Sequence, residues 1–242
     1  MRILVTGSAD GLGRAAAATL LSAGHDVVVH VRNRGRLPAV QELLDLGAGI
    51  VVGDLADLEQ TRGLAEQANA IGRMDAVIHN AGVSSGPTCM PVNVVAPYVL
   101  TASMLRADRL VYLSSGMHRG GRPRLDTVEW SGTRTPGNYS DSKLYVTALT
   151  VALARLWPDV LCNAVDPGWV PTRMGGASAP DDLRLGHLTQ EWLATSDDPE
   201  ALTSGGYWHH QRRSDPHPSV PDELFQNQLL ASLAAFTGTT LD

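Results

Sequence analysis

Short apolar runs alternate along the whole chain with longer segments of helical periodicity. The runs predict buried strands near residues 3–5, 26–31, 49–52, 75–79, 109–113, 160–165 and 206–208. The segments between them predict helices near residues 14–21, 37–46, 58–71, 91–106, 139–157, 183–194 and 222–236. Regular alternation of strands and helices is typical of an α/β fold with a parallel sheet. No internal repeat is visible, so residues 1–242 are expected to form a single domain.

A glycine-rich turn joins the first strand to the first helix. It reads Thr6-Gly7-Ser8-Ala9-Asp10-Gly11-Leu12-Gly13 and is followed by an alanine run. Glycines at these positions allow a tight turn, the close approach of a pyrophosphate, and contact between helix and strand. The turn also aims backbone N–H groups and a helix N-terminus at phosphate. Because a strand precedes this turn and a helix follows it, the turn predicts a dinucleotide-binding site.

The end of the second strand indicates which dinucleotide is bound. A carboxylate there would accept hydrogen bonds from the ribose of NAD, whereas arginine accommodates the 2′-phosphate of NADP. No carboxylate occurs from His30 to Leu37, and three arginines do. This favours NADP, with Arg32 the first candidate and Arg34 or Arg36 as helpers. Asp10 argues for NAD, and an ordinary solvated loop remains the alternative reading of the arginines.

Among 19 cationic residues the chain has one lysine, Lys143, four positions after Tyr139. At this spacing the two side chains share one face of a helix. A neighbouring ammonium favours the ionised phenol, so Tyr139 is expected to have a lowered pKa and to act as a proton donor and acceptor. On this evidence alone, a solvated lysine in an arginine-rich chain explains the pair equally well.

Composition and charge exclude several functional classes. A net charge of −6 and a pI near 5.7 argue against nucleic-acid binding. Cys89 and Cys162 have neither disulfide nor zinc spacing and are expected to be buried and free. No apolar segment is long enough to span a bilayer, and Met1-Arg2 leads directly into the first strand. No membrane association is therefore expected, and the predicted location is the cytoplasm.

Three ordered motifs resemble those of the short-chain dehydrogenase/reductase family. They are TGxxxGxG from Thr6 to Gly13, Asn80-Ala81-Gly82 after the fourth strand, and the YxxxK of Tyr139 and Lys143. The resemblance covers nearly the whole chain. It implies a single doubly wound Rossmann domain, with a parallel sheet of about seven strands and helices on both faces.

The resemblance also implies roles for individual residues. Ser115 corresponds to the catalytic serine and Asn93 to an asparagine that holds a water in a proton relay. Thr172 ends a PGxVxT turn and is expected near the nicotinamide carboxamide. Asp54 is placed to accept from the adenine amino group, or it caps a turn. The predicted catalytic residues are Asn93, Ser115, Tyr139 and Lys143. The predicted cofactor site comprises Gly7, Asp10, Gly11, Leu12, Gly13, Arg32, Asp54, Leu55, Asn80, Ala81, Gly82, Tyr139, Lys143, Pro167, Gly168, Val170 and Thr172.

Three segments bear on the substrate. Residues 82–91 are shorter than is usual in the family, which leaves substrate preference and homo-oligomer formation open. The sequence from Ser114 to His118, SSxxH with an insertion after it, is similar to the retinol dehydrogenase and WW-domain oxidoreductase branch. Its arginines could attract an anionic substrate, but a flexible, solvated loop is the favoured interpretation. Residues 173–180 have the composition of an active-site lid.

No metal site is expected. His209, His210 and His217 are the histidines that suggest one, but adjacent residues of a strand point to opposite faces.

Together these features predict reversible hydride transfer between NADP(H) and a small-molecule carbonyl or alcohol, with Tyr139 as general acid and base. Two alternatives stay open. One is an NAD-dependent alcohol dehydrogenase of the same family. The other is a non-catalytic dinucleotide-binding redox sensor, which has no need of the full Asn-Ser-Tyr-Lys set.

Overall fold

In the part of the chain that the structure describes, eight strands form one sheet at the centre of the protein. The computed structural model describes residues 1–133 and 138–241. The strands are β1 (Arg2–Val5), β2 (Asp26–Val31), β3 (Gly49–Val52), β4 (Ala76–His79), β5 (Arg109–Leu113), β6 (Leu161–Asp166), β7 (Tyr207–His209) and β8 (Arg212–Arg213). Their order is β3-β2-β1-β4-β5-β6-β7-β8, and all neighbours pair in parallel except β7 and β8. The expected doubly wound parallel sheet is confirmed, with one short antiparallel strand added.

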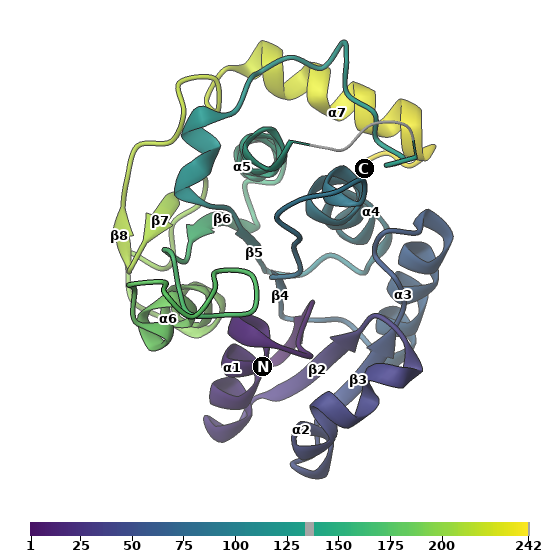
Figure 1. Ribbon diagram of the computed structural model, residues 1–242, viewed down its shortest axis with the longest axis vertical. Coiled ribbons are helices and arrows are strands. Elements are labelled where there is room, and N and C mark those ends of the chain that lie inside the picture. Colours follow the sequence, from purple (N-terminus) through teal and green to yellow (C-terminus); the bar gives the residue numbers. More distant parts are fainter. Residues whose placement is uncertain (134–137, 242) are drawn as a thin grey trace.

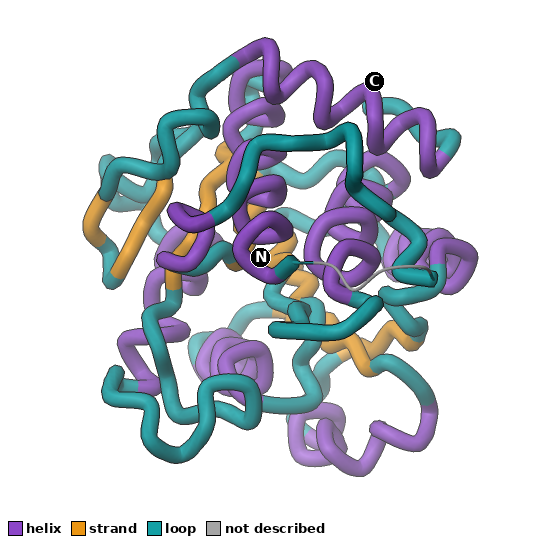
Figure 2. Tube along the Cα trace, turned by 45° about the horizontal axis from the view of Figure 1, so that its top comes forward, coloured by secondary structure: helices purple, strands orange, loops and turns teal. Residues whose placement is uncertain are grey.

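Helices cover both faces of the sheet (Figures 1 and 2). They are α1 (Gly11–Ser22), α2 (Gln41–Asp45), α3 (Leu58–Ile71), α4 (Ala96–Ser103), α5 (Tyr139–Leu156), α6 (Leu183–Thr195) and α7 (Glu223–Thr237). Successive side chains of β1 point to opposite faces of the sheet, and each face forms a core with one layer of helices. Leu4 packs into the core formed with α3, α4 and α5. Ile3 and Val5 pack into the core formed with α1, α2 and α6.

Two predicted helices have a different form. The segment 37–46 is a 3₁₀ helix, η1 (Arg34–Val40), followed by the single turn of α2. Pro38 lies inside η1 and lacks the N–H that an α-helix needs there. The helix expected at 91–106 begins with a π-helical turn, η2 (Pro91–Val95), and ends at Ser103. Single π turns inside helices are frequent at functional sites.

Helix α5 is buried on nearly all sides, which fixes the two residues at its start. Its residues 141–150 are all buried. Helix α7 and the segment after β5 cover its outer face, as Figure 1 shows for α7. The ring of Tyr145 packs against Trp130 and Phe225, with centroids 5.9 Å and 6.0 Å away. The Trp130 indole N–H donates to the Ser232 hydroxyl at 2.9 Å.

The segment after Ser115 begins with a 3₁₀ helix, η3 (Gly116–Gly120), and continues as a loop in which Arg119, Arg122 and Arg124 are exposed, as predicted. The Arg119 guanidinium donates to the Asp215 carbonyl at 2.8 Å and lies over the Tyr207 ring. One backbone carbonyl and an aromatic face therefore contact Arg119, which is nevertheless exposed. No described helix is long and apolar enough to cross a membrane. Cys89 and Cys162 are buried and free, as predicted.

Candidate functional site

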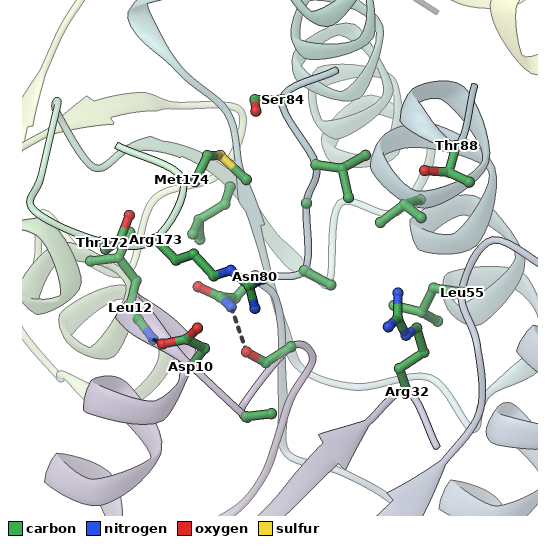
Figure 3. Close-up of a pocket in the computed structure, with 18 of the residues that line it drawn as sticks. Asp10, Leu12, Arg32, Leu55, Asn80, Ser84, Thr88, Thr172, Arg173 and Met174 are labelled. Atoms are coloured by element: carbon green, nitrogen blue, oxygen red, sulfur yellow. Dashed lines mark hydrogen bonds between the residues drawn. The ribbon is translucent and has the colours of Figure 1, made fainter. Parts of the chain in front are cut away.

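A cavity of about 590 Å³ opens along the carboxyl ends of the strands (Figure 3). It lies where the strand order reverses, between β1 and β4, and in open α/β sheets this is where ligands bind. Its wall includes most of the predicted cofactor residues: Gly7, Asp10, Gly11, Leu12, Arg32, Asp54, Leu55, Asn80, Ala81, Gly82, Tyr139, Lys143, Pro167 and Thr172.

The glycine turn makes a floor that has no room for side chains. Gly7 and Gly11 have φ values of +69° and +52°, a region that favours glycine. A Cβ on Gly13 would lie 2.3 Å from the Asn80 side-chain nitrogen, and one on Gly7 would lie 2.9 Å from the Ala81 Cα. The Asn80 amide in turn donates to the Thr6 carbonyl at 2.9 Å. Gly13 serves this packing and does not line the cavity.

A buried histidine supports the same turn from below. The Gly7 N–H donates to His30 Nδ1 at 3.0 Å, so the opposite nitrogen, Nε2, donates to the Gly53 carbonyl at 2.8 Å. Burial lowers the pKa of His30, which keeps the ring neutral and able to accept from Gly7. The role was missed in the sequence, although a histidine inside the apolar run 27–31 is a visible signal.

Charged side chains from the ends of β2 and β3 also line the cavity. Arg32 and Arg36 both line it, and Figure 3 places Arg32 beside Leu55. Asp54 also lines it, but its carboxylate accepts from the Ala56 N–H at 3.0 Å. Of the two roles considered for Asp54, the turn cap is thus present in the fold.

Tyr139 and Lys143 line the cavity from the first turns of α5. Helix α5 begins there because the Asn138 side chain caps it, accepting from the Asp141 N–H at 3.1 Å. Lys143 is buried, and its ammonium donates to the Leu113 carbonyl at 2.6 Å. The Lys143 Nζ lies 5.6 Å from the centre of the Tyr139 ring. The predicted sharing of one helix face is therefore present.

Contrary to the prediction from the sequence, the structure does not lower the pKa of Tyr139. Burial disfavours the phenolate and raises the pKa of Tyr139, and Cys89 and Asp166 raise it further. A hydrogen bond with the Ser115 hydroxyl acts in the opposite direction. Burial also lowers the pKa of Lys143 to about 8. The expectation counted the neighbouring charge and omitted desolvation, which is the larger effect here.

Ser115 follows β5 and meets Tyr139 through that hydrogen bond. Its hydroxyl also accepts from the Met117 N–H at 3.2 Å, which starts η3. Behind it, the fully buried His118 donates from Nδ1 to the Ser115 carbonyl at 2.7 Å and accepts from the His217 N–H at 3.0 Å. His118 therefore holds the backbone that carries the serine. Ser114 lines the cavity, but its hydroxyl forms a hydrogen bond with the Thr147 hydroxyl at 2.6 Å.

Asn93 lies in the π turn, and both polar atoms of its side-chain amide make hydrogen bonds. The Asn93 Oδ1 accepts from the Val83 N–H at 2.8 Å. Its Nδ2 donates to the Val83 carbonyl and to the Ser142 hydroxyl, both at 2.9 Å. Both donors of the amide are therefore used within the protein, and the side chain positions residues 82–83 against α5. The water-holding role of Asn93 stays a prediction.

The loop between β6 and α6 (residues 167–182) borders the cavity through Pro167, Thr172, Arg173 and Met174. The Thr172 methyl carbon lies 3.2 Å from where a Cβ on Gly11 would be. Val170 and Gly168, also predicted as cofactor residues, face elsewhere. Val170 packs against Gly186, and Gly168 packs against the carboxylate of Asp181. Neither lines the cavity.

Comparison with known proteins agrees with this geometry. Residues 1–116 match the model of the short chain dehydrogenase family. An oxidoreductase of Emericella nidulans is 36% identical over 245 residues, which cover 95% of this chain and 94% of the fungal protein. Short-chain dehydrogenase chry4 of Gibberella zeae is 35% identical over 254 residues, 99% of this chain and 98% of that protein. The chain belongs to the short-chain dehydrogenase/reductase family.

Among solved structures, a short-chain dehydrogenase of Shigella flexneri in complex with NADP aligns with a TM-score of 0.68. It is 26% identical, and the alignment covers 87% of this chain and 97% of that one. The present short-chain dehydrogenase/reductase is an oxidoreductase that acts on carbonyl and alcohol groups with a nicotinamide cofactor. The side-chain-free floor at Gly7 and Gly11, with Ala81 and Gly82 beside it, fits such a dinucleotide.

The short-chain dehydrogenase/reductase site also contains residues that sequence reasoning did not assign to it. They are Ala9, His30, Ala56, Val83, Ser84, Ser85, Thr88, Val92, Leu113 and Ser114. Most belong to turns whose position depends on how distant segments meet, which spacing along the chain does not give. Arg36 also lines the cavity and was named as a helper, and Arg173 and Met174 were predicted only as part of a lid.

The histidines near the C-terminus differ from their expected arrangement. His209 and His210 were expected on opposite faces of a strand, yet their rings stack with centroids 3.9 Å apart. The reason is that β7 ends at His209, and His210 has a φ of +48° in the tight turn to β8. Across residues 1–133 and 138–241, no three His, Cys, Asp or Glu side chains converge as a metal site.

Proposed function

We propose that this enzyme transfers hydride reversibly between NADP(H) and a small carbonyl or alcohol, with Tyr139 as the general acid and base. The observation that carries the proposal is the arrangement of one continuous cavity. Its floor at one end is the glycine turn, and Tyr139 and Lys143 line its other end. Ser115 shares a hydrogen bond with the Tyr139 phenol, so the two hydroxyls are close enough together to bind one substrate oxygen.

The direction of proton transfer follows from the protonation states. The dinucleotide, when bound, supplies or accepts the hydride. In carbonyl reduction, Tyr139 donates its proton to the substrate oxygen, while Ser115 donates a hydrogen bond as negative charge develops there. Burial raises the pKa of Tyr139, so the phenol carries the proton that it donates in reduction. In alcohol oxidation the same residue accepts that proton as general base.

Lys143 and Asn93 support the phenol in different ways. The Lys143 ammonium is held by the Leu113 carbonyl and lies near the backbone of Gly82, beside the expected nicotinamide ribose. From there it stabilises negative charge on the tyrosine oxygen after the proton has left. Asn93 acts as a positioning residue, because its amide holds Val83 and thus the turn that borders the cavity.

The preference for NADP rests on the adenosine end. Arg32 and Arg36 line the cavity there, and no carboxylate follows β2 before Leu37. Arginine at this position accommodates a 2′-phosphate. The related Shigella flexneri enzyme is complexed with NADP, which supports the same choice. Asp10 lines the cavity as well, but its carboxylate accepts from the Gly11 N–H at 2.8 Å and caps α1.

Replacing Arg32 with alanine is expected to weaken NADPH binding by about 10- to 100-fold, the effect of losing a charge-assisted hydrogen bond to phosphate. The affinity for NADH should change by less than about twofold, because NADH has no 2′-phosphate for Arg32 to bind. Fluorescence titration of both cofactors measures the two dissociation constants. Arg34→Ala is the matched control, since Arg34 is exposed and does not line the cavity. Equal losses for NADPH and NADH would contradict the assignment.

Exposed apolar side chains occur on two segments of the site. Met117 follows Ser115 on η3 and is exposed, as are Trp169 and Met174 in the loop 167–182. Met174 lines the cavity itself. Exposed apolar side chains beside a few polar catalytic groups favour a substrate with an apolar body and one carbonyl group.

A cofactor and substrate panel tests the proposed function. The purified chain is mixed with NADPH or NADH and with aldehydes, ketones and quinones of different polarity, and absorbance of the reduced cofactor is followed. We expect NADPH consumption, fastest with apolar carbonyl compounds. An NAD-dependent alcohol dehydrogenase would instead turn over alcohols with NAD. A redox sensor would bind the dinucleotide and turn over nothing, and that result would refute the proposal.

A further inference from the structure

Arg173 is a cation at the edge of the cavity with no role in the site described above. It follows Thr172 in the loop 167–182 and lines the cavity. Figure 3 shows its side chain extending from the loop across the cavity toward Asn80. Its guanidinium makes no hydrogen bond or ion pair with any residue of the described ranges 1–133 and 138–241. An arginine directed into a binding cavity without a protein partner is available to an anionic ligand.

The position of Arg173 identifies which part of a ligand it would meet. Thr172 touches the glycine turn at Gly11, so the next residue stands beside the start of α1. That is the part of a Rossmann site that receives the diphosphate of a dinucleotide. Arg32 lies at the adenosine end, on the opposite side of the cavity in Figure 3. The two arginines therefore face different phosphates.

Hydrogen bonds within the loop 167–182 stabilise the backbone next to Arg173. The Thr172 hydroxyl accepts from the Gly175 N–H at 3.1 Å, and the Thr172 carbonyl accepts from the Gly176 N–H at 2.8 Å. The Trp169 indole donates to the Gly175 carbonyl at 2.8 Å. The backbone on both sides of Arg173 is thus fixed by the loop's own hydrogen bonds, while the guanidinium itself is left unpaired.

We propose that Arg173 binds the diphosphate of the nicotinamide dinucleotide and so couples cofactor binding to the position of the loop 167–182. This rests on the cofactor assignment of the proposed function. Arginine suits the task because its planar fork donates two parallel hydrogen bonds to phosphate oxygens. The diphosphate brings two negative charges to the narrow space between Arg173 and the start of α1. The loop that carries Trp169 and Met174 is then held over the substrate end.

Three ligands separate the phosphates that the two arginines bind. NADPH carries the diphosphate and the 2′-phosphate, ADP-ribose carries only the diphosphate, and 2′-AMP carries only the 2′-phosphate. Isothermal titration with each is done for the wild type, Arg173→Gln and Arg184→Gln. Arg184 is the matched control, because it is an exposed arginine at the start of α6 that does not line the cavity.

For Arg173→Gln we expect affinity for ADP-ribose and NADPH to fall by about 10- to 100-fold, and affinity for 2′-AMP to stay within about twofold. Arg184→Gln should leave all three unchanged. Unchanged ADP-ribose binding in Arg173→Gln would overturn the proposal while leaving the cofactor assignment intact. A loss seen only in the substrate KM would place the arginine on the substrate and overturn it too. A wild type that binds none of the three ligands would refute both.

Trypsin gives a second readout on the unaltered chain. The Arg173–Met174 bond lies in an exposed part of the loop, and trypsin cleaves after arginine. We expect ADP-ribose and NADPH to slow cleavage at this bond severalfold, measured by mass spectrometry of the fragments, and 2′-AMP to leave it unchanged. Equal cleavage rates with and without ADP-ribose would contradict the coupling of the loop to the diphosphate.

Discussion

Replacing Tyr139 with phenylalanine should lower kcat by about 100- to 10,000-fold, the range that general acid–base catalysis contributes. The ring remains and fills the same space, so the cavity keeps its shape. The proton donor and the hydrogen bond to Ser115 are lost together. Steady-state assays with the best carbonyl substrate measure kcat, and fluorescence titration measures NADPH affinity, which should change little.

Tyr145→Phe is the control for this variant. Tyr145 lies on the same helix, and its hydroxyl donates to the Arg124 carbonyl at 2.6 Å, away from the cavity. Its loss should lower the thermal midpoint and leave kcat within a few fold. If Tyr139→Phe kept near-normal turnover, the proton would have to come from another group and the mechanism would be wrong.

The arrangement of the chain was predictable because its signals are local. The apolar runs at 26–31, 49–52 and 109–113 coincide with β2, β3 and β5. The glycine turn, the Asn80-Ala81-Gly82 turn and the Tyr139–Lys143 pair do line one cavity. Each of these depends on residues close in sequence, and the parallel sheet then brings the strand ends to one edge.

What was missed depends on contacts between distant segments. His30 acts only because β2 brings it under Gly7 and beside Gly53. The Asn93 amide forms hydrogen bonds with the Val83 backbone, a contact that no sequence motif predicts. The pKa of Tyr139 rises because the segments around α5 bury it, and burial is a property of the whole fold. Arg173 was counted only as part of a lid composition, since its direction depends on how the loop folds.

The buried lysine is the other residue on which large effects are expected. Lys143→Arg should lower kcat/KM by at least about 100-fold, although the positive charge is kept. The ammonium fits between the Leu113 carbonyl, 2.6 Å away, and the backbone of Gly82, whose Cβ position is 3.5 Å from it. A guanidinium is larger and planar, and overpacking a buried site displaces its neighbours. Steady-state kinetics measure the loss, and circular dichroism checks that the variant is folded.

The pH dependence of binding separates the charge of Lys143 from its shape. Burial lowers the pKa of Lys143 to about 8. As pH rises through this value the free wild-type enzyme loses the ammonium, so NADPH affinity should fall above pH 8. In Lys143→Arg the guanidinium stays protonated, and this decline should be absent while the activity stays low. Lys143→Met, which removes the charge, should bind NADPH weakly at every pH. Near-normal turnover in Lys143→Arg, or the same decline above pH 8 in all three proteins, would show that the ammonium does not have the proposed role.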